Sequence, residues 1–178
     1  MKNILIILAD GFEEVEALGT IALLKRSGLE VDIYALNNTK ACGKHHLVIS
    51  DLIKLESVNT SEYDALLLPG GPHYAELEAN PKVKEIIIDF MNKEKLVCGI
   101  CAAPTILGHM GYLKDKNYTC FTSMNEDFGG TYIDQYVVTD GNIITARSAA
   151  ASIDFAFAII HYLQGEKQEE KIKNEIYY

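Results

Sequence analysis

The chain has 178 residues, 48% of them hydrophobic and 23% charged, and it carries a formal net charge of -9 at pH 7. This composition excludes a disordered chain, and the length predicts a single domain over residues 1–178 that buries its own core. The acidic charge excludes a nucleic-acid binder, and no apolar run approaches the ~20 residues of a membrane span, which predicts no membrane association. Without a signal-peptide pattern, we expect a cytoplasmic protein whose four cysteines are reduced thiols.

The first half of the chain predicts strands that alternate with a helix. Residues 3–8 form a continuous apolar run rich in β-branched side chains, as in a strand buried on both faces of a parallel sheet. Residues 13–27 have a helical pattern and residues 30–36 are a second strand, so this order predicts a parallel pair with a right-handed crossover. Residues 40–49 have a weaker pattern that indicates a hairpin. Residues 64–68 are another buried strand, which runs into a Pro-Gly-Gly-Pro turn.

The second half continues the alternation. Asn80 and Pro81 supply a helix cap and a proline at the first helical position. The remaining predicted elements are helices over residues 80–92, 102–110 and 152–163, a strand over 96–99, a hairpin of strands 136–139 and 143–146, and a short charged helix from residue 166. This order predicts an α/β fold with a doubly wound, mostly parallel sheet and helices on both faces. In such folds, ligands bind beyond the carboxyl ends of the strands.

Three predicted strands end in distinctive loops, with the sequences ADGFEE, LPGGP and CGICAAP. In the first loop, Glu13, Glu14 and Glu16 would repel a pyrophosphate, which excludes a dinucleotide-binding turn. Helix-dipole complementarity is enough to explain Glu13 and Glu14. Glu16 falls on the apolar side of the helix beside Phe12, where an ionised carboxylate is poorly solvated. We therefore expect Glu16 to be a buried functional acid.

The Pro-Gly-Gly-Pro turn has two interpretations. It can simply end the strand, which is the commoner role of such a turn. Alternatively, the small residues Gly70 and Gly71 bring bare backbone amides to the edge of the sheet, where these amides can stabilise an oxyanion or bind a carbonyl oxygen.

The segment GICAA resembles the nucleophile elbow G-x-S-x-G, with Cys101 in the place of serine. Such a strained strand-to-helix turn directs the thiol at a helix N-terminus, whose dipole is expected to lower the pKa of Cys101. A redox dithiol of Cys98 and Cys101 is the competing interpretation, but Cys98 ends an apolar run and is expected to point into the sheet. Cys42 and Cys120 have no partner spacing and are expected to be structural.

No histidine is an obvious base for this thiol. His109 lies too far along the same helix, and His161 is expected to be a structural residue. His73 follows the LPGGP loop, and we expect it to be an exposed polar residue. Apart from the single cysteine pair, no histidine or cysteine cluster has the spacing of metal ligands, so we expect neither a metal nor another cofactor.

The segments LADGFEEVEA, YDALLLPGG, CGICAAPTILG and DGNIITARSAAASIDFAFAII, in this order, resemble the ThiJ/PfpI family in its DJ-one (parkinsonism-associated protein deglycase) branch. The resemblance covers nearly the whole chain. It implies a flavodoxin-like fold of the class I glutamine amidotransferase-like type, and a homodimer. It also implies that Cys101 is the reactive cysteine, that a protonated Glu16 hydrogen-bonds to its sulfur, and that the oxyanion amides come from Gly71 and Ala102.

At several positions this chain differs from the pattern of the family it resembles. An anion pocket near the cysteine, supplied in part by the dimer mate, would use Arg26 and Lys44, and lysine replaces arginine at the second position. Members with protease-type or stand-alone glyoxalase activity usually carry a histidine directly after the cysteine. This chain has Ala102, which places it in the deglycase-like branch, so we expect no peptidase activity. Phe121 stands where the branch often has a further histidine, and Pro72 stands where an amide-bearing residue is common.

The resemblance implies a cysteine-dependent glyoxalase or deglycase that acts without a cofactor on small aldehydes, reactive dicarbonyls or glycated side chains. One alternative is a non-enzymatic oxidative-stress sensor or chaperone-like protein in which Cys101 is oxidised to sulfinate. A weaker alternative is an amidotransferase-like or esterase-like hydrolase, because these enzymes share the elbow.

Overall fold

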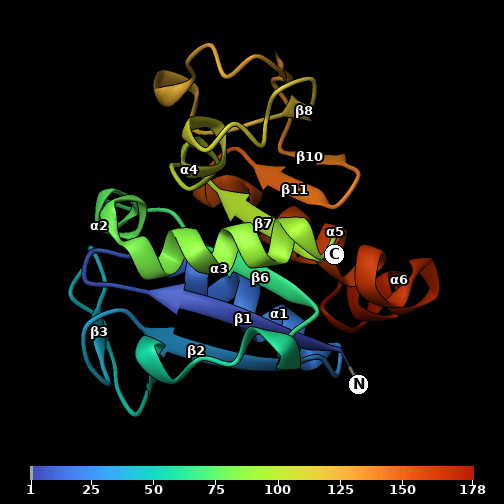
Figure 1. Cartoon of the computed structure of the whole chain (residues 1–178). Helices are drawn as coiled ribbons and strands as arrows, with labels where there is room; N and C mark the ends of the chain where they lie inside the picture. Colours follow the sequence, from blue (N-terminus) through green and yellow to red (C-terminus); the bar gives the residue numbers. More distant parts are fainter. Residues whose placement is uncertain (1) are drawn as a thin grey trace.

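The computed structural model describes residues 2–178 and is built around a seven-stranded sheet (Figure 1). Its strands lie in the order β10-β11-β7-β6-β1-β2-β5. In chain order they are β1 (Asn3–Leu8), β2 (Glu30–Ala35), β5 (Ile53–Lys54), β6 (Ala65–Leu68), β7 (Leu96–Ile100), β10 (Val137–Asp140) and β11 (Ile143–Ala146). Neighbouring strands are parallel except for the hairpin of β10 and β11. The predicted α/β fold with a mostly parallel sheet is therefore confirmed.

Helices cover both faces of this sheet (Figure 1). The α-helices are α1 (Thr20–Arg26), α2 (Tyr74–Ala79), α3 (Pro81–Asn92), α4 (Pro104–His109), α5 (Ser152–Gln164) and α6 (Glu166–Glu175). Helices α1 and α5 pack on one face of the sheet, and α3 and α4 pack on the other. Smaller elements are the strands β3 (Ala41–Cys42), β4 (Val48–Ile49), β8 (Asn117–Tyr118) and β9 (Thr131–Tyr132), the π-helical turn Val15–Gly19, and 3-10 turns at Leu55–Ser57, Thr60–Glu62, Thr122–Met124 and Ala149–Ala151.

Strand β1, which lies inside the sheet between β6 and β2, shows why the sheet needs cover on both sides. Successive side chains of a strand point to opposite faces. Ile4 and Ile6 accordingly pack in the core under α1 and α5, while Leu5 and Ile7 pack in the core under α3 and α4. All four side chains are fully buried, and each contributes about 1.5–3 kcal/mol of hydrophobic stabilisation.

Several other predicted elements are confirmed. The side chain of Asn80 accepts hydrogen bonds from the amides of Lys82 and Val83, and Pro81 opens α3. The hairpin expected over residues 40–49 is the antiparallel pair β3 and β4, and the charged tail forms α6. Within residues 2–178, no helix combines the length and the apolar character needed to cross a membrane.

Three local features differ in detail from the prediction. The helix expected over residues 13–27 is present, but its first part is the π-helical turn Val15–Gly19, which leads into α1. Helix α2 was not predicted, because the preceding proline and glycines indicated only a loop. The helix expected from residue 102 begins at Pro104, since the chain must first make the turn that presents Cys101.

Candidate active site

The site lies where the loops after β1, β6 and β7 meet. These three strands are neighbours in the order β7-β6-β1 and run parallel, so their carboxyl ends open on one edge of the sheet. A pocket of about 360 Å³ is found there. Its lining residues are Glu13, Glu16, Lys44, Gly71, Pro72, Tyr74, Cys101, Ala102, Phe121, Met124, Ser148 and Ala149.

Cys101 stands directly after β7 in a strained backbone conformation. Its φ is 64°, in the left-handed region that costs a non-glycine residue about 1–3 kcal/mol. Two hydrogen bonds hold this turn: the Cys101 amide donates to the carbonyl of Ala146 over 2.9 Å, and the Phe121 amide donates to the carbonyl of Cys101 over 2.8 Å. The strained strand-to-helix turn expected from the sequence is therefore present.

Glu16 faces this thiol from the π-helical turn after β1. Its side chain is only 1% exposed, and its carboxyl lies close to the Cys101 side chain, since a Cβ at Gly70 would collide with both groups. One carboxyl oxygen, Oε2, also accepts the amide of Gly70 over 3.0 Å. The Glu13 carboxylate caps the turn by accepting the Glu16 amide over 2.8 Å. The predicted burial of Glu16 is thus found, together with a fixed orientation.

Both glycines of the LPGGP loop are required because neighbouring atoms leave no room for a side chain at either position. A Cβ at Gly70 would lie 2.6 Å from the Cβ of Cys101 and would also collide with the Glu16 carboxyl. Gly71 has a φ of 103°, and a Cβ there would lie 2.5 Å from the backbone nitrogen of Glu13. The Gly70 amide differs from the expectation that it faces an oxyanion, because it donates to Glu16. The amides of Gly71 and Ala102 are the ones that act on Cys101, where they lower the pKa of the thiol against the effect of burial.

Burial sets the protonation of the two reactive groups. Burial raises the pKa of Glu16 from 4.5 to about 7, and the charge of Glu13 adds to this rise, while hydrogen bonds from Cys101 and the Gly70 amide oppose it. Burial and then the negative charge of Glu16 raise the pKa of Cys101 to about 12. The predicted lowering of the pKa of Cys101 by a helix dipole was therefore wrong. Above about pH 7 the pair therefore holds one proton, which these pKa values place on the Cys101 sulfur, beside an ionised Glu16.

The two cationic residues expected at an anion pocket are separated. Lys44 lines the pocket beside Glu16. Arg26 is exposed at the last residue of α1 and is not among the residues that line the pocket. Phe121, which replaces the expected imidazole, is 43% exposed and lines the pocket next to the thiol.

His73 is buried, so the prediction of an exposed polar residue was wrong. Its side chain is 2% exposed, and its Nδ1 accepts the amide of Ala9 over 3.1 Å. Its Nε2 then carries the hydrogen and donates to the carbonyl of Pro69 over 2.9 Å. Burial also lowers the pKa of His73. The neutral imidazole therefore ties the end of β1 to the end of β6 and is no base for Cys101.

The other cysteines lie in different surroundings. Cys98 is fully buried within β7, and burial raises its pKa well above 9.0. Cys120 is also buried, and burial raises its pKa to about 11. Cys42 is partly exposed, and all four cysteines are free thiols. Since the Cys98 sulfur is enclosed in the core, it points into the sheet as expected and is closed to disulfide exchange from solvent.

Three further residues that line the pocket were not predicted from the sequence. Tyr74 lies in the unpredicted helix α2, Met124 lies in a 3-10 turn, and Ser148 precedes α5. Only the folded chain brings these separate segments to one pocket, and no local pattern in the sequence marks them.

Fold and site together define an α/β protein of the class I glutamine amidotransferase-like type, in which a cysteine on a strand-to-helix elbow faces a buried glutamate. The family model of the DJ-1/PfpI family matches residues 2–162. The chain belongs to the DJ-1/PfpI family.

Two relatives of named activity and a solved structure support this membership. The chain is 30% identical over 177 residues to a glutathione-independent glyoxalase of Caenorhabditis elegans, covering 96% of this chain and 94% of the relative. It is 34% identical over 148 residues to a deglycase of Pyrococcus abyssi, covering 82% of this chain and 89% of the relative. A crystal structure of a DJ-1 superfamily protein from Salmonella typhimurium superposes with a TM-score of 0.91 at 32% identity, covering 100% of this chain and 99% of that one.

Proposed function

We propose that the protein is a cofactor-independent glyoxalase or deglycase acting on reactive dicarbonyls or early glycation adducts, with Cys101 as nucleophile and Glu16 as acid and base. The observation that carries this proposal is that Cys101 and the buried Glu16 line one pocket with Gly71 and Ala102, whose amides favour the charged form of the thiol. The relatives from C. elegans and P. abyssi, a glyoxalase and a deglycase, have activities of the same kind.

The first step of the proposed reaction forms a hemithioacetal. The Glu16 carboxylate takes the proton of the Cys101 thiol as the sulfur attacks the aldehyde carbon of methylglyoxal. The aldehyde oxygen becomes an oxyanion that accepts the amides of Gly71 and Ala102 and is then protonated by Glu16. Gly71 and Ala102 line the pocket together with Cys101, so their amides are near the thiol before the charge develops.

The second step moves hydrogen within the bound substrate. The Glu16 carboxylate removes the proton from the former aldehyde carbon, and a proton returns to the neighbouring carbon through an enediol. The aldehyde carbon is thereby oxidised to a thioester while the ketone carbon is reduced to an alcohol. Water then hydrolyses the thioester, releasing lactate and regenerating the thiol. The substrate supplies both electrons, so no redox cofactor is required.

Conversion of methylglyoxal to lactate tests the proposal. We expect activity in the wild type, a loss of at least about 100-fold in Glu16→Gln, and no detectable turnover in Cys101→Ala. The wild-type kcat/KM should rise with pH through about 7, where Glu16 gives up its proton. The exposed thiol variant Cys42→Ala is the matched control and should turn over like the wild type. Equal rates in all four proteins would contradict the proposal.

Oxidation sensing is a second candidate function. The amides of Gly71 and Ala102, which favour the charged form of Cys101, could equally hold the oxygens of a sulfinate, and Glu16 in its protonated form could donate to one of them. Titration with peroxide followed by mass mapping should then show two added oxygens at Cys101 before any at Cys42. Equal oxidation of the two partly exposed thiols would contradict this role.

The proposed assembly is a homodimer of single-domain chains in a reducing compartment such as the cytoplasm. Val15, Leu47 and Val48 are 56%, 55% and 62% exposed, and the hydrogen bond between Glu14 and the His45 amide places their segments together. Such clustered apolar side chains favour contact with a second copy. Light scattering should give twice the chain mass for the wild type and a single chain mass for Val48→Asp.

A further inference from the structure

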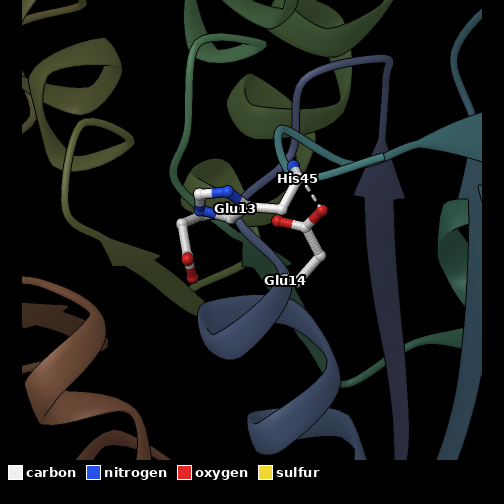
Figure 2. Close-up of side chains that lie close together, drawn as sticks. All are labelled: Glu13, Glu14 and His45. Atoms are coloured by element: carbon white, nitrogen blue, oxygen red, sulfur yellow. Dashed lines mark hydrogen bonds between the residues drawn. The ribbon is translucent and has the colours of Figure 1, made fainter. Parts of the chain in front are cut away.

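A second cluster of ligand-type side chains lies beside the pocket. Glu13, Glu14 and His45 each offer one ligand atom, and these atoms all lie within 4.8 Å of one another (Figure 2). The two glutamates come from the end of the first loop, whereas His45 comes from the hairpin between β3 and β4. Because these segments are about thirty residues apart in the sequence, no short ligand-spacing motif announces the cluster.

The backbone holds the hairpin in this position. Phe12 pairs with Gly43 in an isolated bridge, and the Lys44 amide donates to the carbonyl of Phe12 over 2.8 Å. The amide of His45 donates to Oε1 of Glu14 over 2.6 Å. Gly43 leaves room for this arrangement, because a Cβ there would lie 2.5 Å from the Cδ of Glu14. The ligands are therefore placed by backbone contacts and not by chance surface proximity.

A buried oxygen without a partner points to a missing ligand. Glu14 is only 5% exposed, and its Oε2 has no hydrogen-bond partner. Figure 2 shows this second carboxyl oxygen on the side facing the His45 imidazole, while the first oxygen accepts the His45 amide. A buried carboxylate oxygen without a partner is unfavourable, and a cation is the group that would compensate it most fully.

We propose that Glu13, Glu14 and His45 form a binding site for one divalent transition-metal ion, with Zn²⁺ as the best match. Zn²⁺ accepts mixed imidazole and carboxylate ligands and completes a four-coordinate shell with water, whereas Mg²⁺ and Ca²⁺ prefer oxygen ligands alone. Glu14 offers Oε2, and Glu13 retains Oε1 because its Oε2 accepts the Glu16 amide. The site goes beyond the proposed function and does not use Cys101.

The bound ion would connect the first loop to the hairpin. Glu13 caps the turn that carries Glu16, and His45 lies on the hairpin that also presents Lys44 to the pocket. The Lys44 ammonium opposes a nearby cation, but this side chain is exposed and can swing away from it. The ion would therefore act as a structural brace for the pocket wall and would bind more tightly if the Lys44 charge were removed.

Titration of the full-length apo protein with Zn²⁺ and Co²⁺ tests this site. We expect one ion per chain by calorimetry in the wild type, and a loss of affinity of at least tenfold in His45→Asn. The neighbouring His46→Asn is the matched control, because His46 is exposed, has a φ of 70° that asparagine tolerates, and is outside the cluster. Lys44→Gln should bind at least as tightly as the wild type.

The absorption spectrum of bound Co²⁺ also distinguishes this site from a site with a cysteine ligand. Co²⁺ on imidazole and carboxylates gives visible bands without the strong sulfur-to-metal charge-transfer absorption that a cysteine ligand would add. Stoichiometric binding that is weakened in His45→Asn and lacks this absorption would support the site. Binding unchanged in His45→Asn, a charge-transfer band, or no stoichiometric binding by the wild type would each overturn it. His45 is exposed, so its replacement should leave the fold intact, which a thermal melt checks.

Discussion

The carboxyl of Glu16 makes the stability of the protein depend on pH. In the folded chain, burial raises its pKa from 4.5 to about 7, so the native state holds a proton that the unfolded state has already lost between these values. The native state is therefore favoured by this group below about pH 4.5, and the advantage is lost as the pH rises through 7. The shift corresponds to about 3 kcal/mol of penalty for the ionised form.

Replacing this carboxyl by an amide should remove the penalty. At pH 8 we expect the free energy of unfolding of Glu16→Gln to exceed that of the wild type by about 1–3 kcal/mol. The reason is that the amide oxygen of the new glutamine can still accept the Gly70 N–H, but no charge is buried. At pH 4.5 the difference should shrink towards zero. Urea unfolding at the two pH values measures it, with the exposed Glu30→Gln as the control. A difference that is the same at both pH values would contradict the assigned cause.

At the scale of single residues, the sequence predicted burial better than it predicted protonation. Helical spacing alone placed Glu16 on an apolar face, and the elbow pattern placed Cys101 on a strained turn. The pKa of Cys101 was misjudged because it depends on Glu16, which lies 85 positions earlier in the chain. His73 was misjudged for a similar reason, since its partners are backbone atoms of Ala9 and Pro69 that only the folded sheet supplies.

Among the structural elements, the loop after β6 is the one that tolerates least change. Gly71 has a φ of 103°, and a side chain there would meet the backbone of Glu13 and Gly11 at 2.5 Å. Because the loop after β1 and the loop after β6 are both held by these strands, neither backbone segment can move to make room for a side chain. The loop, more than the strands beside it, sets the distance between the first loop and Cys101.

A pair of glycine substitutions separates this effect from a general loss of flexibility. We expect Gly71→Ala to lower the free energy of unfolding by about 2–4 kcal/mol through backbone strain and collision. Gly19, with a helical φ of -61° and open space around its missing Cβ, is the matched position. Gly19→Ala should raise the free energy of unfolding by about 0.5–1 kcal/mol. Denaturant unfolding measures both, and a similar loss in the two variants would contradict the argument.

Elements with a strong local signal could be predicted from the sequence, and elements set by tertiary contact could not. The apolar runs of β1, β6 and β7 and the Asn80-Pro81 start of α3 were read correctly. The π-helical turn Val15–Gly19 has no signature of its own. It serves to direct Glu16 at Gly70 and Cys101, a requirement of the site and not of helix propensity.

The exposed position of Arg26 bears on how two copies of the protein assemble. This residue is exposed at the end of α1 and does not line the pocket of its own chain, whereas the family resemblance assigns it to an anion pocket near the cysteine. Both statements hold if a second copy of the chain supplies Arg26 to the pocket. The proposed homodimer would then be needed for a complete site, and each site would contain residues of both chains.

A heterodimer built from two defective chains tests this arrangement. We expect Arg26→Ala to lower kcat/KM for methylglyoxal about tenfold, as the loss of a charge-assisted contact would, and Cys101→Ser to be inactive. A dimer with one chain of each type, purified through two different tags, has one pocket with Cys101 from the first chain and Arg26 from the second. Its activity should recover to about half that of the wild-type dimer. The reciprocal dimer, in which wild type is paired with the double variant, carries Cys101 and Arg26 on one chain and should stay near a tenth of that value. If Arg26 instead acts within its own chain, the two dimers exchange their activities.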